Sequence, residues 1–210
     1  MARLLYIESS PRKDRSSSIN IANAFIEEYR KARPDDTIDT LDLWKANLPA
    51  FDGDTINAKY ALLHGENKTD EQIRAWAPVV QTIEDFKSAD KYLISVPMWN
   101  FGIPYKLKHY IDILIQPSYT FSFSPDEGYK GLVTGKPVSV VYARGGAYKT
   151  GSDTEGLDFQ KSYMELVLGF IGFTDIRTIV AEPMLMTTPE DKNKIVEAAK
   201  QQAIKIAREY

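Results

Sequence analysis

The chain contains no cysteine and only two histidines, His64 and His109, among its 210 residues. The lack of cysteine excludes disulfides, thiolate chemistry and cysteine-ligated metals, and it favours the cytoplasmic location that we expect. Because the two histidines lie far apart in the sequence, a histidine-built metal site is not expected either. We therefore expect a protein without a bound metal.

The sequence also lacks a basic run and a long apolar run. Lys and Arg number 26 against 29 Asp and Glu, for a net charge of −3, which argues against a nucleic-acid partner. No stretch approaches the length of a membrane span, and the run at residues 3–7 is too short and comes too early for a signal peptide. With 43% hydrophobic residues, the chain is long enough for a full core, and we expect a single domain over residues 1–210.

Apolar runs typical of strands alternate with segments of helical spacing. Strands are predicted at residues 4–7, 37–43, 90–96, 137–142 and 174–181. Helices are predicted at residues 19–33, 55–63, 69–86 (with a capping box at Thr69 and either an interruption or a kink at Pro78), 105–115, 157–171 and from Thr188 to the end. This alternation predicts an α/β fold with a doubly wound, flavodoxin-like parallel sheet of order 2-1-3-4-5 and helices on both faces.

The third predicted strand is followed by a connection rich in large apolar residues. Pro97 ends the strand, because a proline nitrogen has no hydrogen to donate to a sheet. Met98, Trp99 and Phe101 follow, although connections normally lie in water. These side chains either fold back onto the core or contact a flat apolar ligand, and Asn100 adds an amide that both donates and accepts.

Two further connections lie at the same edge of the predicted sheet. The one after the first strand carries serines before a helix, which suit either helix capping or an anion such as phosphate: Ser10, Ser16, Ser17 and Ser18. The one after the fourth strand forms either a tight turn or a close backbone approach to a ligand: Ala143, Arg144, Gly145 and Gly146. Neither G-x-G-x-x-G nor G-x-x-x-x-G-K-[ST] occurs, so a mononucleotide with a planar head, FMN, fits best.

These loops, with Gly131–Lys136 and Leu168–Gly172, resemble the FMN-dependent NADH:quinone oxidoreductases, also called FMN-dependent NADH-azoreductases. The resemblance implies that the three loops bind FMN, one per subunit of a homodimer, and that NADH or NADPH reduces quinones and azo compounds. Arg12, Lys13 and Arg15 leave the choice of nucleotide open, because they could reach a 2′-phosphate. Both substrates would use one pocket, which predicts ping-pong kinetics with flavin-centred chemistry and no catalytic side chain. Trp99 and Ala143 replace the tyrosine and serine common in the family, which makes the substrate preference less transferable.

A long excursion at about residues 117–135 separates the third and fourth units. Residues 119–123 alternate aromatic and small hydroxyl residues, which predicts a hairpin arm with its rings on one face. The resemblance implies that Phe121 walls the substrate pocket across the dimer, and the competing interpretation packs these rings on the helix at 157–171. An electron carrier of the flavodoxin type is the main alternative function. A phosphoacceptor domain is less well supported, because Glu8 stands alone at the end of the first strand.

Overall fold

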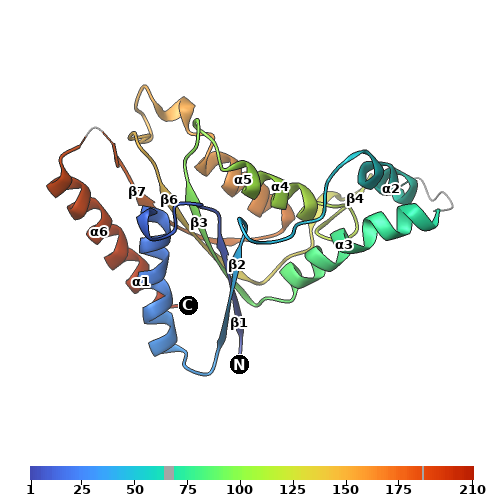
Figure 1. Ribbon diagram of the computed structural model, residues 1–210, viewed down its shortest axis with the longest axis horizontal. Coiled ribbons are helices and arrows are strands. Elements are labelled where there is room, and N and C mark those ends of the chain that lie inside the picture. The colour runs from blue at the N-terminus through green and yellow to red at the C-terminus, as the bar shows by residue number, and fades with distance from the viewer. Residues whose placement is uncertain (64–68, 186) are drawn as a thin grey trace.

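The computed structural model describes residues 1–63, 69–185 and 187–210, so His64 lies outside the described residues. Its centre is a five-stranded parallel sheet of order β2-β1-β3-β6-β7 (Figure 1). The strands are β1 (Arg3–Glu8), β2 (Thr37–Asp42), β3 (Lys91–Pro97), β6 (Pro137–Ala143) and β7 (Asp175–Ala181). In sheet order this is the predicted 2-1-3-4-5 arrangement, and the predicted fold class is confirmed.

The three central strands are apolar on both faces, whereas β2 lies at an edge and keeps polar residues exposed. β1, β3 and β6 are buried along their whole interiors, as a parallel sheet covered by helices requires. Parallel pairing places Glu8 opposite Ser95 and Pro97 opposite Ala143. The carboxyl ends of these strands therefore lie at one edge of the sheet, and the connections that follow them start side by side.

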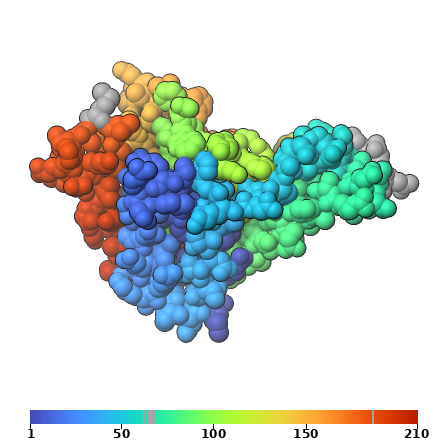
Figure 2. All heavy atoms as spheres, viewed as in Figure 1, coloured from blue at the N-terminus to red at the C-terminus, as the bar shows by residue number. Residues whose placement is uncertain are grey.

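Helices cover both faces of the sheet (Figure 1). One face carries α1 (Ser17–Ala32) and α6 (Pro189–Arg208), and the other carries α3 (Asp70–Lys87), α4 (Tyr105–Leu114) and α5 (Lys161–Ile171). The helix α2 (Gly53–Leu63) packs on α3, and Figure 2 shows this pair extending away from the body of the molecule. In the described part of the chain, none of the helices combines the length and apolar character needed to cross a bilayer.

Two helices differ from their predicted limits. Pro78 does not interrupt α3, which runs through it. Pro78 lies on the exposed face, where the carbonyl that loses its N–H donor can bond to water. The helix α5 begins at Lys161 instead of residue 157, because Glu155–Leu157 forms a separate short 3-10 turn, η2. Asp158 then accepts a hydrogen bond from the Lys161 N–H at 2.9 Å and marks the start of α5.

The excursion contains an antiparallel hairpin of β4 (Phe121–Ser124) and β5 (Gly128–Gly131). The Phe121 ring lies 4.9 Å from that of Phe170 on α5, and Phe123 lies 4.9 Å from Tyr129. Tyr119 precedes the strand and its ring lies 6.5 Å from that of Trp76. The hairpin was predicted, but its first ring contacts a different part of the protein, because the strand begins only at Phe121.

A close backbone contact anchors the return of the hairpin to α5. A Cβ on Gly131 would lie 2.3 Å from the backbone nitrogen of Gly172, a residue with φ +117. The neighbouring Val133 N–H donates to the carbonyl oxygen of Ile171 at 2.8 Å. Both glycines are therefore required by the approach of the two chain segments, a requirement that explains their place in the motifs noted in the sequence.

Candidate functional site

The connections after β1, β3 and β6 line one cavity of about 180 Å³ at the carboxyl edge of the sheet. Most of the residues predicted from the sequence line it: Ser10, Ser16, Ser17, Pro97, Met98, Trp99, Ala143, Arg144 and Gly145. Arg12 and Arg15, which the sequence analysis placed within reach of a nucleotide phosphate, also line it. The remaining lining residues were not predicted: Met184, Leu185 and Lys192. Outside the lining lie the predicted residues Ser18, Asn100, Phe101, Phe121 and Gly146.

The serines after β1 surround the N-terminus of α1 without capping it. Ser16 is the N-cap residue, yet its side chain makes no capping hydrogen bond. Its Oγ lies 3.2 Å from the Oγ of Ser18, which is fully buried and does not line the cavity. The interpretation of Ser16 as an ordinary cap is therefore wrong. An N-terminus without a side-chain cap, beside the hydroxyls of Ser16 and Ser17, favours an anion.

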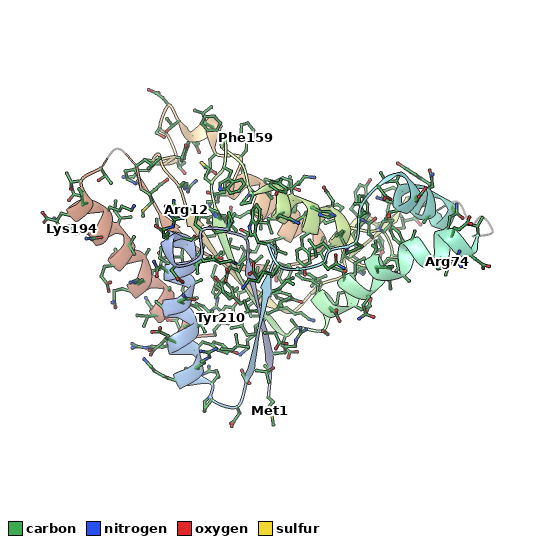
Figure 3. The ribbon with its side chains drawn as sticks, in the orientation of Figure 1. Met1, Arg12, Arg74, Phe159, Lys194 and Tyr210 are labelled. Carbon is green, nitrogen blue, oxygen red and sulfur yellow. The ribbon has the colours of Figure 1, made fainter. Side chains whose placement is uncertain are left out.

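Three cationic residues add positive charge around the same cavity: Arg12, Arg15 and Lys192. Within the described part of the chain, none of these side chains forms an ion pair, and no carboxylate lines the cavity. Figure 3 places Arg12 above the start of α1, near the carboxyl ends of the central strands. Such a set of unpaired cations raises the local potential and attracts negatively charged ligands.

The connection after β3 forms a tight turn over Trp99–Gly102. The N–H of Trp99 donates to the Gly102 carbonyl at 3.0 Å, and the N–H of Gly102 donates back at 2.9 Å. Asn100 has φ 46 and Phe101 has φ 68, the left-handed conformation of a type I′ turn. Asn tolerates this conformation but Phe does so rarely, so the turn is strained. Among the described residues, neither central N–H has a protein acceptor.

The Arg144 guanidinium pairs with acidic side chains of its own chain. It is buried and pairs with the carboxylates of Asp158 and Glu182, and its carbon lies 5.5 Å from the Tyr148 ring centroid. Glu182 also accepts a hydrogen bond from the Tyr148 N–H at 2.9 Å. The charge of this predicted cofactor-binding residue is therefore balanced by two acids, and Arg144 links the loop after β6 to the loop after β7.

The two glycines after Arg144 are packed against other parts of the chain. A Cβ on Gly145 would lie 2.8 Å from the side chain of Leu185, and one on Gly146 would lie 3.2 Å from the hydroxyl of Tyr148. The Leu185 N–H donates to the carbonyl oxygen of Gly145 at 3.0 Å. Leu185 thus reaches the cavity because it is bonded to this loop, a contact that no local sequence pattern indicates.

The end of β2 supports the site and was missed by the sequence analysis. Lys13, at φ 49, pairs with Glu8 and with Asp42, whose Oδ1 lies 2.7 Å from its Nζ. Burial is the largest single effect on both groups and opposes their charges, but the hydrogen bonds and opposite charges around each group together outweigh it, so the pKa of Lys13 is raised and the pKa of Asp42 is lowered. Two residues on, Trp44 donates from its indole N–H to the Ser9 carbonyl at 2.9 Å. Applying the carboxyl-end rule to the second strand would have indicated this segment.

Comparison with known proteins agrees with this architecture. A family described by its flavodoxin-like fold matches residues 2–207. A protein of Desulfotalea psychrophila named FMN-dependent NADH:quinone oxidoreductase is 51% identical over 100% of this chain and 98% of its own. One of the same name from Nitratidesulfovibrio vulgaris is 50% identical over the full length of both chains.

Solved structures agree as well. An azoreductase of Bacillus anthracis superposes with a TM-score of 0.91 at 31% identity and 100% coverage of both chains. An FMN-dependent NADH-azoreductase of Bacillus anthracis, solved in complex with FMN, gives 0.87 at 25% identity, covering 99% of this chain and 100% of the other. The family predicted from the loop motifs is confirmed: the chain belongs to the flavodoxin-like family whose curated relatives are the FMN-dependent NADH:quinone oxidoreductases.

Proposed function

We propose that the protein is an FMN-dependent oxidoreductase that transfers two electrons from NADH to quinones and azo compounds. One observation carries the proposal: a single cavity combines an uncapped helix N-terminus and unpaired cations with the side chains of Met98 and Trp99. An anionic tail and a flat apolar head fit these two halves. The names of full-length relatives and structural neighbours support the same cofactor and the same reaction class.

The cavity residues suit FMN in two groups. Ser10, Ser16, Ser17 and the first N–H groups of α1 would hold the phosphate, as helix N-termini commonly do. Pro97, Met98 and Trp99 would lie along the ring system. When bound, FMN supplies the redox chemistry, because it accepts a hydride from a nicotinamide and passes two electrons on.

The protein's own groups would bind and polarise the ring. The free N–H groups of Asn100 and Phe101 are donors for one polar edge of the flavin. The Gly145 and Gly146 amides would stabilise negative charge that develops on reduction, an electrostatic contribution. Ala143 brings only its backbone to this edge. The buried ion pairs of Arg144 would hold the loop in place, because its charge is already balanced.

We also propose that donor and acceptor use the cavity in turn, giving a ping-pong mechanism. The test is steady-state NADH oxidation by the FMN-loaded protein with menadione, varied against NADH. Parallel lines in the double-reciprocal plot are expected, and intersecting lines would contradict one shared site. Negligible turnover with full flavin occupancy would favour an electron carrier, and a purified protein that neither contains nor binds FMN would reject the whole proposal.

A homodimer is part of the proposal. Large apolar side chains stay exposed on α4 and α5 and in the connections before them: Phe101, Tyr105, Phe159 and Leu166. Exposed large apolar side chains that gather in one patch commonly mark an interface. Phe121, half-buried against Phe170 and absent from its own cavity, would then face the cavity of the partner subunit. Sedimentation of the purified protein measures the oligomeric state directly.

A further inference from the structure

Trp44 contacts two of the connections that form the cavity without lining the cavity itself. It follows the edge strand β2, which was not among the strands expected to contribute to the site. Its indole nitrogen faces the serine-bearing connection after β1, and its ring faces the turn after β3. One side chain therefore joins the anion-binding half of the cavity to the aromatic half.

The first contact is the hydrogen bond from the Trp44 indole N–H to the carbonyl oxygen of Ser9, at 2.9 Å. Ser9 directly precedes Ser10, the first serine of the cavity lining. The other polar groups of Ser9 already bond to β3: its hydroxyl donates to the Ser95 carbonyl at 2.6 Å, and its N–H donates there at 3.3 Å. With the contact to Trp44, the N–H, hydroxyl and carbonyl of Ser9 all have hydrogen-bond partners, so the start of the serine connection is held in place.

The second contact is a closed group of three aromatic rings. The Trp44 centroid lies 5.8 Å from that of Trp99 and 5.4 Å from that of Tyr105. Trp99 and Tyr105 lie 6.3 Å apart, and Trp44 meets Tyr105 edge to face at 81°. Aromatic pairs at these separations attract one another beyond the effect of burial. Trp99 begins the strained turn, so the contact with Trp44 supports the turn at its first residue.

Trp44 is itself held in place. Its backbone N–H donates to Asp42 at 3.1 Å, and Asp42 pairs with Lys13 of the serine connection. The intervening Leu43 is fully buried and donates its N–H to the carbonyl oxygen of Glu8 at 3.1 Å. A residue anchored at its backbone, its indole nitrogen and its ring can transmit a fixed spacing between the groups that it contacts.

We propose that Trp44 is a positioning residue that sets the spacing between the serine connection and Trp99. It thereby tunes both the affinity for FMN and the fit of flat aromatic acceptors. The inference rests on the proposed function, because it concerns the residues assigned there to the cofactor. The turn at Asn100 and Phe101 requires such support, since strained backbone persists only where the surroundings hold it.

The test compares Trp44→Phe and Trp44→Leu with a matched control, Trp76→Phe. Trp44→Phe keeps a ring beside Trp99 but loses the hydrogen bond to Ser9, whereas Trp44→Leu loses both. Trp76 lies in the core at α3, away from the cavity lining, and its indole nitrogen has no hydrogen-bond partner in the described residues. The control therefore measures what the loss of an indole costs in stability alone.

The measurements are the dissociation constant of FMN, from flavin fluorescence during titration of the apoprotein, and the menadione KM of the loaded protein. Trp44→Phe is expected to raise the FMN dissociation constant roughly two- to tenfold, the effect of one hydrogen bond. Trp44→Leu is expected to raise the menadione KM as well, by roughly two- to tenfold, the effect of one aromatic pair, with a smaller change in kcat. Trp76→Phe should lower the melting temperature and change neither constant.

Two results would overturn the inference. Trp44 variants that lose only thermal stability, with both constants equal to those of the control, would give Trp44 a purely structural role. A change in kcat alone, with FMN affinity and KM unaltered, would also exclude control of spacing. If the parent protein itself binds no FMN, the proposed function fails and takes this inference with it, and that outcome is seen before any variant is compared.

Discussion

Nε of Arg144 lies 3.0 Å from a carboxylate oxygen of Glu182, and the arginine side chain is only 3% exposed. Asp158 pairs with the same guanidinium from the turn that precedes α5. The arginine therefore joins three segments that are distant in the sequence, and two of them, the connections after β6 and β7, line the cavity. Removing one member of a buried ion pair is costly, because its partner is left buried with an uncompensated charge.

Replacing Arg144 with alanine is expected to destabilise the protein by roughly 3–5 kcal/mol, the cost of breaking a buried ion pair. Urea unfolding of the apoprotein, followed by circular dichroism, measures this change. Arg208→Ala is the control, because Arg208 pairs with Glu28 but is itself largely exposed, and exposed pairs contribute about 1 kcal/mol or less. Equal losses for the two variants would show that the pairing of Arg144 does not stabilise the loop.

Ser17 and Ser18 are neighbours with different expected roles. Ser17 lines the cavity, whereas Ser18 is fully buried beside Ser16. Ser17→Ala is expected to weaken FMN binding by about 1.5–3 kcal/mol, the usual value for a hydrogen bond to a charged group, with little change in melting temperature. Ser18→Ala should lower the melting temperature and leave FMN binding nearly unchanged. Equilibrium dialysis and thermal unfolding of both variants measure the two effects. A Ser17 variant that retains FMN as the parent does would show that the phosphate does not bind at this loop.

The unpaired cations Arg12 and Arg15 should act on the phosphate and not on the ring. Comparison of FMN with riboflavin, which lacks the phosphate, isolates that contribution. The double variant Arg12→Gln, Arg15→Gln is expected to bind FMN more weakly and with less dependence on salt, since screening acts over about 10 Å at 0.1 M. Its affinity for riboflavin should equal that of the parent. Parallel losses for both ligands would mean that the arginines shape the loop instead.

The fold was predictable because its signals are local. Thr69 and Gln72 form the complete capping box, and Thr188 caps α6 with Pro189 in the first turn, as their spacing indicated. The alternation of apolar strands with helical segments gave the sheet order. The start of α5 was not predictable in this way, because it depends on Asp158, which accepts a hydrogen bond from the Lys161 N–H and also pairs with Arg144.

The candidate site was predictable only in its outline. The ends of β1, β3 and β6 follow from the sheet order, so the loops were found. The direction of a side chain does not follow: Arg144 turns inward to acids that lie 14 and 38 positions further along the chain. The support by Trp44 depends in the same way on a tertiary contact with Ser9, and no spacing in the sequence encodes it.

The pairing of Lys13 with Asp42 predicts how stability changes with pH. The lowered pKa of Asp42 contributes stability above its unfolded value of about 3.9, which is lost as the pH falls through the folded value. The raised pKa of Lys13 contributes stability below its unfolded value of about 10.4, which is lost as the pH rises through the folded value. Asp42→Asn should therefore melt below the parent between about pH 4 and 10, and the difference should shrink as the pH falls below about 4.

Thermal unfolding across this range measures the difference. Asp39→Asn serves as the control on the same strand, because Asp39 pairs with Arg3 at a largely exposed position, where pairs contribute little. A difference between parent and Asp42→Asn that stays constant down to pH 3 would exclude ionisation of Asp42 as its cause.

Two roles are open to Phe121: packing within its own chain, or contact with the cavity of a partner subunit. Its ring contacts Phe170 at 4.9 Å and Tyr129 at 6.0 Å within its own chain, which is the packing expected of a purely structural hairpin. The side chain is only half-buried, and the remaining surface is free to face the cavity of a partner subunit. Phe123, two residues on, is 60% exposed and provides a matched control on the same strand.

Phe121→Ala is expected to raise the menadione KM about two- to tenfold, the effect of losing one aromatic contact, while the FMN dissociation constant stays unchanged. If the hairpin also seals the dimer, activity should fall on dilution, because dissociation of subunits follows mass action. Steady-state kinetics over a range of protein concentrations and sedimentation velocity measure both effects beside Phe123→Ala. A Phe121 variant that loses stability but keeps the kinetics and the sedimentation coefficient of the parent would assign the ring to the packing on α5 alone.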